Sequence, residues 1–111
     1  METIVKDPLG RVTGITIPAP KIKLYIEREF DQIRLYGKLT ANEGALGSLE
    51  EPEVLCCLTD SAGRILYASL STHSGCFRKN REAAFLIEIK EVSRKCNWDE
   101  INRIELSVIY L

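Results

Sequence analysis

The residues best suited to metal or nucleophilic chemistry are four cysteines and the single histidine. Zinc takes four ligands of these types, and the candidates are Cys56, Cys57, His73, Cys76 and Cys96. Their spacing argues against a shared site, because the sequence has no Cys-x-x-Cys pair and adjacent residues of a strand point to opposite faces. We therefore expect reduced, separately packed thiols with no metal and no cofactor. A disulfide between Cys76 and Cys96 stays open as an alternative.

The neighbours of His73 do not suit catalysis. Residues 71–76 contain no Gly-x-Ser-x-Gly nucleophile elbow. A nucleophile pair of Cys76 and His73, three residues apart in a loop, matches no familiar arrangement of nucleophile and base. The sequence therefore predicts a protein that is not an enzyme and has no catalytic residue.

A second candidate site is a group of basic and aromatic residues at alternating positions in residues 21–40. On one side of two paired strands this segment would gather Lys21, Lys23, Tyr25, Arg34, Tyr36 and Lys38. Exposed rings among cations on a sheet are typical of platforms for single-stranded nucleic acid. A solvated face and a contact with another protein are the alternatives. The net charge of −1 argues against nucleic acid.

The last strand of the sequence supplies a third candidate. In residues 104–111 the second row of side chains becomes apolar at Ile109 and Leu111. An exposed apolar strand edge promotes aggregation unless something covers it. We expect either pairing with a second copy, which makes a homodimer, or cover by the N-terminal hairpin of the same chain.

The elements that must position these residues are short strands. Apolar and polar residues alternate with a period of two, which predicts strands at residues 21–27, 33–40, 54–59, 64–72, 84–90 and 104–111. Both rows of residues 54–59 are at most weakly polar, so this strand is predicted to be central. Residues 60–63 predict a turn, and residues 95–103 one helical turn capped by Asn97.

The N-terminal part is predicted to form a first hairpin. Residues 3–5 and 12–17 would be its strands, and residues 7–10 its turn. Pro18 and Pro20 cannot donate to a strand ladder. They are therefore predicted to mark a crossing of the chain from one sheet to the other.

Length and composition limit the fold class. The chain has 111 residues, of which 45% are hydrophobic and 28% charged, which suits a single domain over residues 1–111. Six to eight short strands without a long amphipathic helix predict an all-β antiparallel β-sandwich, with a small partly open β-barrel as the alternative. No apolar run approaches the roughly 20 residues of a membrane span, and the N-terminal residues lack the features of a signal peptide. We expect a complete cytoplasmic protein that does not bind a membrane.

Three segments of the second half follow a recognisable order. Residues 54–66 form a strand, an acidic turn with Gly63 and an outgoing strand; residues 83–89 form a strand around Phe85; and residues 104–110 form a short apolar strand. This order resembles the bacterial immunoglobulin-like, fibronectin-type sandwich modules of the FxLYD type, over residues 53–110. The resemblance implies an immunoglobulin-like antiparallel β-sandwich of about seven strands and a role as a binding or spacer domain.

Three functions compete at this point. The first is a non-enzymatic interaction module that binds an unidentified protein partner through an exposed loop or a sheet edge. The second is a sheet face that binds single-stranded nucleic acid. The third is a thiol- or metal-dependent protein. The β-rich pattern and the absence of a catalytic grouping favour the first.

Overall fold

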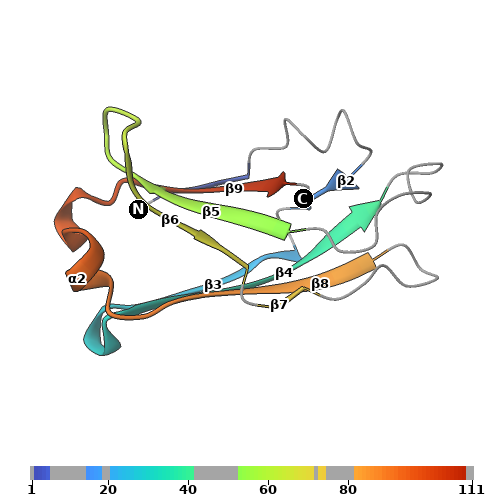
Figure 1. The fold of residues 1–111 in the computed structure, drawn as a ribbon, viewed down its shortest axis with the longest axis horizontal. Coiled ribbons are helices and arrows are strands. Elements are labelled where there is room, and N and C mark those ends of the chain that lie inside the picture. Colours follow the sequence, from blue (N-terminus) through green and yellow to red (C-terminus); the bar gives the residue numbers. More distant parts are fainter. Residues whose placement is uncertain are drawn as a thin grey trace.

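The computed structural model describes residues 2–5, 15–18, 21–41, 53–71, 73–74 and 82–109, which form two facing β-sheets (Figure 1). One sheet has the order β1 (Glu2–Val5), β9 (Arg103–Ile109), β5 (Glu53–Thr59) and β6 (Ile65–Leu70). The other has the order β2 (Ile15–Thr16), β4 (Gln32–Ala41), β8 (Glu82–Ile89) and β7 (His73–Ser74), and β3 (Lys23–Glu27) also pairs with β4. The predicted all-β class is confirmed.

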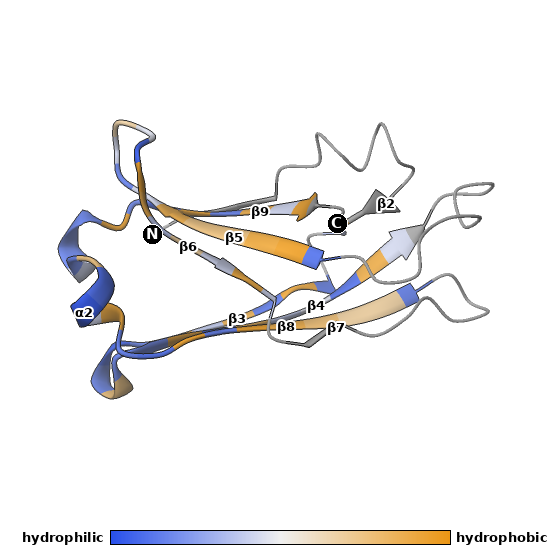
Figure 2. Cartoon of the chain, in the orientation of Figure 1, coloured by the Kyte–Doolittle hydropathy of each residue, from blue (hydrophilic) through white to orange (hydrophobic). Residues whose placement is uncertain are grey.

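The core lies between the two sheets and is built from alternate residues of their strands. Cα partners share a face of a sheet, so the inward rows can be read from the register. The fully buried side chains with the largest volumes come from both sheets and from the segment between β8 and β9: Ile33, Leu35, Leu39, Val54, Leu58, Ile87, Ile89, Val92, Ile104, Leu106 and Val108. Figure 2 shows the same concentration of hydrophobic residues along β5 and β8.

The predicted central strand is confirmed. β5 pairs with β6 on one side and with β9 on the other, antiparallel in both cases. Its outward row is also well covered, since Cys57 and Thr59 are buried as well as Cys56 and Leu58. A strand with neighbours on both edges needs few polar side chains, which explains its weakly polar sequence.

The predicted N-terminal hairpin is wrong. β1 pairs in parallel with β9 in one sheet, and β2 pairs with the end of β4 in the other sheet. The chain therefore crosses between the sheets in the interval between Val5 and Ile15. Two short strands close in sequence suggest a hairpin, but here each finds its partner far along the chain.

Pro18 does not mark a crossing between sheets, and Pro20 lies outside the described residues. β2 and β3 lie before and after this segment and pair with the same strand, β4, whose other edge is occupied by β8. The Lys21 N–H donates to the Pro18 carbonyl at 3.0 Å, which forms a tight turn. The turn that begins at Pro18 therefore separates β2 from β3 along one edge of the same sheet.

The two predicted polar turns are confirmed. Asp60 accepts from the backbone N–H groups of Ala62 and Arg64 at 3.0 and 2.9 Å, and Gly63 takes a positive φ of 81°. Asn97 caps a 3-10 helix, Trp98–Glu100, by accepting from the Asp99 N–H at 3.0 Å. One further helical turn, α2 (Val92–Lys95), precedes it and was not predicted. Neither this helix nor any other within the described residues is long and apolar enough to cross a membrane.

Candidate functional site

The structure brings the predicted basic and aromatic residues together on the outward face of β3 and β4. Lys23 lies opposite Tyr36, and Tyr25 opposite Arg34. The Tyr25 and Tyr36 rings meet edge to face with centroids 5.9 Å apart, and their side chains are 44% and 37% exposed. The Arg34 guanidinium lies over the Tyr25 ring, 5.4 Å from its centroid. The face therefore presents two adjacent aromatic rings to solvent.

Three cations of this face, Lys21, Arg34 and Lys38, already have carboxylate partners. Arg34 Nε donates to Glu27 Oε1 at 2.7 Å, and this hydrogen bond raises the pKa of Arg34. Glu82 pairs with Lys21 and, at 3.7 Å, with Lys38. A phosphate would have to compete with these carboxylates. The neutralisation weakens the nucleic-acid interpretation, and nucleic-acid binding stays a prediction.

The last strand does not form the edge of its sheet at its N-terminal half. β1 covers the outer side of β9 from Arg103 to Leu106. Ile109 pairs through its backbone with Glu53 of β5, but its side chain and Leu111 lie outside the described residues. The proposed contribution of Ile109 and Leu111 to an interaction surface therefore stays a prediction.

Among the strands that the structure describes, β6 forms an outer edge of the first sheet. It pairs with β5 on one side and ends the sheet order on the other. All six residues, Ile-Leu-Tyr-Ala-Ser-Leu, are uncharged. Ile65 and Leu70, the first and last of them, are 63% and 43% exposed. Long, uncharged, apolar edges are what natural sheet proteins avoid unless the edge has a partner.

The backbone groups of two β6 residues point away from β5. The Ser71 N–H donates to the Val54 carbonyl at 2.8 Å, and these two residues continue the β5–β6 register. Neighbouring residues of a strand direct their backbone groups to opposite edges. Ala68 and Leu70 therefore present their N–H and C=O groups to the open side, where the Leu70 carbonyl receives the Ser69 hydroxyl at 3.3 Å.

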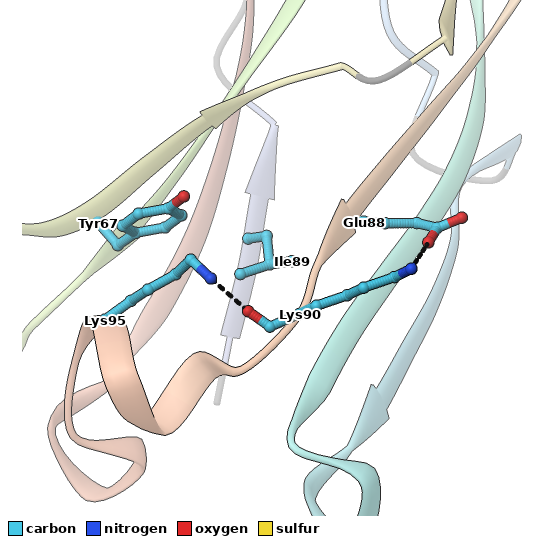
Figure 3. Close-up of a pocket in the computed structure, with 5 residues that line it drawn as sticks. All are labelled: Tyr67, Glu88, Ile89, Lys90 and Lys95. Carbon is cyan, nitrogen blue, oxygen red and sulfur yellow. Dashed lines mark hydrogen bonds and ion pairs between the residues drawn. The ribbon is translucent and has the colours of Figure 1, made fainter.

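A shallow hollow of about 400 Å³ lies beside this edge (Figure 3). It is lined by Tyr67 of β6, by Glu88 and Ile89 of β8, by Lys90 and by Lys95 of α2. The Lys95 ammonium lies 5.6 Å from the centroid of the Tyr67 ring and donates to the Lys90 carbonyl. Tyr67 is the Cα partner of Leu58, whose side chain is fully buried, so this row of β6 faces inward, toward the hollow.

The described cysteines are separate. Cys56 is fully buried and faces the core, whereas its neighbour Cys57 belongs to the outward row of β5. Burial raises the pKa of the Cys56 thiol to about 12 and also raises that of Cys96. Cys76 and the side chain of His73 lie outside the described residues. Within the described ranges, no three His, Cys, Asp or Glu side chains gather closely enough to hold a metal ion.

A polar cluster joins the β3–β4 turn to the segment that follows β8. The Asp31 carboxylate accepts from the Trp98 indole N–H at 2.8 Å, the Ser93 N–H at 2.9 Å and the Ser93 hydroxyl. The Asp31 carbonyl accepts from the Val92 N–H at 3.0 Å. The Arg28 guanidinium pairs with Asp99 at 2.7 Å and lies 5.8 Å from the centroid of the Trp98 ring. These contacts fasten the β3–β4 turn to the segment that follows β8.

The Asp31 carboxylate is expected to make stability depend on pH in acid. Its hydrogen bonds, first that from the Ser93 hydroxyl and then that from Trp98, lower its pKa below the ordinary 3.8. The unfolded chain then binds the proton first as pH falls, so this contribution is present above about pH 4 and is lost as pH drops through the folded-state pKa.

The test compares the melting temperature of Asp31→Asn with wild type at pH 7 and at pH 2.5. Asn tolerates the left-handed φ of 54° at this position, so the variant removes the charge and keeps the turn. We expect Asp31→Asn to melt lower at pH 7 and to differ less from wild type at pH 2.5. Glu29→Gln, in the same turn, is the control. An equal difference at both pH values would contradict the assignment.

Comparisons with known proteins give no relative of this chain. No protein-family model, curated protein or solved structure matches it. Among the described residues, the β6 edge and its adjoining hollow form the clearest candidate binding surface.

Proposed function

We propose that this chain is a non-enzymatic interaction module that binds an extended segment of a partner by adding it as a strand to β6. The observation that carries the proposal is the outer side of β6, which is six uncharged residues long and pairs with no strand of the described residues. In strand addition, main-chain hydrogen bonds give affinity and pockets for alternate side chains give specificity. The Ala68 and Leu70 backbones would supply the main-chain hydrogen bonds.

The hollow of Figure 3 would supply a pocket for the side chains of the added strand. A strand added beyond β6 continues the first sheet, so its inward side chains point toward the edge of β8. There they would meet the Tyr67 ring, the Ile89 side chain and the Lys95 ammonium. This lining suits an apolar stem that ends in an acceptor oxygen, because Lys95 can only donate.

The strand order supports an immunoglobulin-like sandwich as the scaffold. When β3, β4, β8 and β7 are aligned with strands A, B, E and D of that fold, β5 and β9 take the places of C and F. β1 then lies beside β9, where strand G would be, although it runs in the opposite direction. Sandwiches of this kind serve many unrelated functions, so the fold supports the binding proposal without specifying the partner.

A proline at position 68 tests strand addition. Ala68→Pro removes an N–H that faces away from β5, and edge strands tolerate proline at such positions, so the sandwich should still fold. We expect peptides selected on the wild-type protein from a displayed library of random linear peptides to bind Ala68→Pro at least about tenfold more weakly, because one main-chain bond and the adjoining contacts are lost.

Ala68→Ser keeps the backbone donor and is the matched control, with wild-type affinity expected. Amide hydrogen exchange at residues 68 and 70 should slow when a selected peptide is bound. A library that yields no binder, or binders that are indifferent to Ala68→Pro, would exclude the addition of a peptide strand from a different partner at β6.

A further inference from the structure

The uncharged sequence of β6 suits pairing with the same strand of a second copy. We infer that a second copy of this chain occupies the edge, with the two β6 strands antiparallel about a two-fold axis at Ser69. The inference rests on the function proposed above and names its partner. It makes the first sheets of two copies one continuous sheet.

The lack of charge on β6 is what self-pairing requires. A two-fold axis places the same patch of both copies together, so a charged residue near the axis meets a like charge, which is destabilising in directly opposed strands. β6 has no charged residue between Ile65 and Leu70. One described edge strand of the other sheet, β3, carries Lys23 and Glu27 and follows the Pro18 turn. Charges and prolines are the usual devices that block edge pairing, and β6 has neither.

The direction of the backbone fixes the register. Ala68 and Leu70 are the residues of regular β6 backbone that face the open side, since the β5–β6 register shifts nearer Ile65. Pairing Ala68 of each copy with Leu70 of the other satisfies the N–H and C=O groups of all four residues and puts the axis at Ser69. Opposed residues share a face, so each exposed Leu70 side chain packs beside the small Ala68 side chain of the other copy.

The inward row is compatible with the same register. Ser69 shares a face with the buried Cys56, so the Ser69 side chains of the two copies face each other across the axis. A hydroxyl can both donate and accept a hydrogen bond, so the two can pair. Tyr67 keeps its place over the hollow. One short strand from each copy covers much less than the roughly 1,600 Å² of a standard interface. The dimer is therefore expected to be weak and to depend on concentration.

A pair of charge substitutions tests both the partner and the register. Ala68→Glu and Leu70→Lys each place a charge opposite an apolar side chain of the other copy, and both sites are exposed in the single chain. In the double variant, the carboxylate introduced at position 68 of each copy lies opposite the ammonium introduced at position 70 of the other copy. Two ion pairs can therefore form across the axis. Sedimentation equilibrium from about 10 μM to 1 mM should show wild-type mass rising from 12.5 kDa toward twice that value.

We expect each single variant to raise the dimer dissociation constant at least about tenfold and the double variant to return it to within about threefold of wild type. Ala84→Glu, at an exposed alanine of β8 in the other sheet, is the matched control and should dimerise as wild type does. Circular dichroism confirms that each variant is folded.

Two outcomes would overturn the inference. One is wild-type protein that stays at 12.5 kDa over the whole concentration range. The other is a double variant that dimerises more weakly than either single variant, which indicates non-specific apolar contact or another register. Neither outcome touches the proposed function, because peptides sensitive to Ala68→Pro would still establish strand addition by a different partner. Loss of those peptides, with self-pairing intact, would instead restrict β6 to its own copy.

Discussion

Replacing Gly37 by valine should lower the melting temperature by at least about 10 °C, which corresponds to about 3 kcal/mol for a domain of this size. Gly37 belongs to the inward row of β4 and is the Cα partner of Phe85. A Cβ added to Gly37 would lie 2.6 Å from Cε1 of the Phe85 ring and closer still to Cζ. Phe85 is buried, so the ring has no free space into which it can move.

The higher strand propensity of valine does not offset this overlap, because that whole scale spans about 1 kcal/mol. The loss is large against the 5–15 kcal/mol that stabilises a typical domain. Urea or thermal unfolding followed by circular dichroism measures it. Lys38→Val introduces the same side chain one residue later, on the exposed face, and should stay within about 0.5 kcal/mol of wild type.

A second substitution, Phe85→Ala, tests whether overlap with the Phe85 ring causes the loss of stability. Phe85→Ala alone leaves a cavity and should cost about 3–5 kcal/mol. In Gly37→Val with Phe85→Ala the valine fills part of that cavity, so the double variant should lose less stability than the two single variants together. Strictly additive losses, or a Gly37→Val protein as stable as wild type, would show that the ring does not occupy the space above Gly37.

Native alkylation should leave Cys56 unmodified while Cys96 reacts. Burial raises the pKa of Cys56 to about 12, against about 8.5 for a free cysteine, and only the thiolate is nucleophilic. At pH 8 the fraction of Cys56 that is thiolate is therefore about three orders of magnitude lower than that of a free cysteine. Cys96 is partly exposed and shifted less. Peptide mass spectrometry after iodoacetamide treatment reads the modification at each site.

Unfolding in guanidinium is the control for this experiment and should make Cys56 react as fast as any free thiol. If native Cys56 reacts within tenfold of the rate of Cys96, the strand is not buried as the structure has it. A reactive Cys56 would also return the thiol-dependent function to consideration, since a redox or metal role requires an accessible thiolate.

Local patterns predicted the strands that lie in the middle of the chain. The alternation around Ile33 and Leu35 defines an inward and an outward row, and the structure has both rows in β4. It also predicted that Tyr25, Arg34 and Tyr36 share a face. Asn97 and Asp60 were found because caps and polar turns depend on a few adjacent residues.

Contacts between distant residues account for what the sequence did not predict. The ion pairs of Glu82 with Lys21 and Lys38 neutralise a face that looks basic in sequence. The Asp31 contacts with Ser93 and Trp98 position α2, a single turn too short for any periodicity. The position of β6 at the end of its sheet is likewise set by pairing, not by local pattern. One feature of the sequence that could have indicated an edge available for pairing is the run of six uncharged residues without lysine or proline.

The pairing of β1 with β9 affects the order in which the molecule can assemble. Glu2 lies opposite Arg103, so this contact has almost the largest sequence separation that the chain allows. Distant contacts of this kind raise the contact order and slow folding. During translation β1 leaves the ribosome long before its partner has been synthesised, so the outer position beside β9 can be filled only after residues 103–106 have emerged.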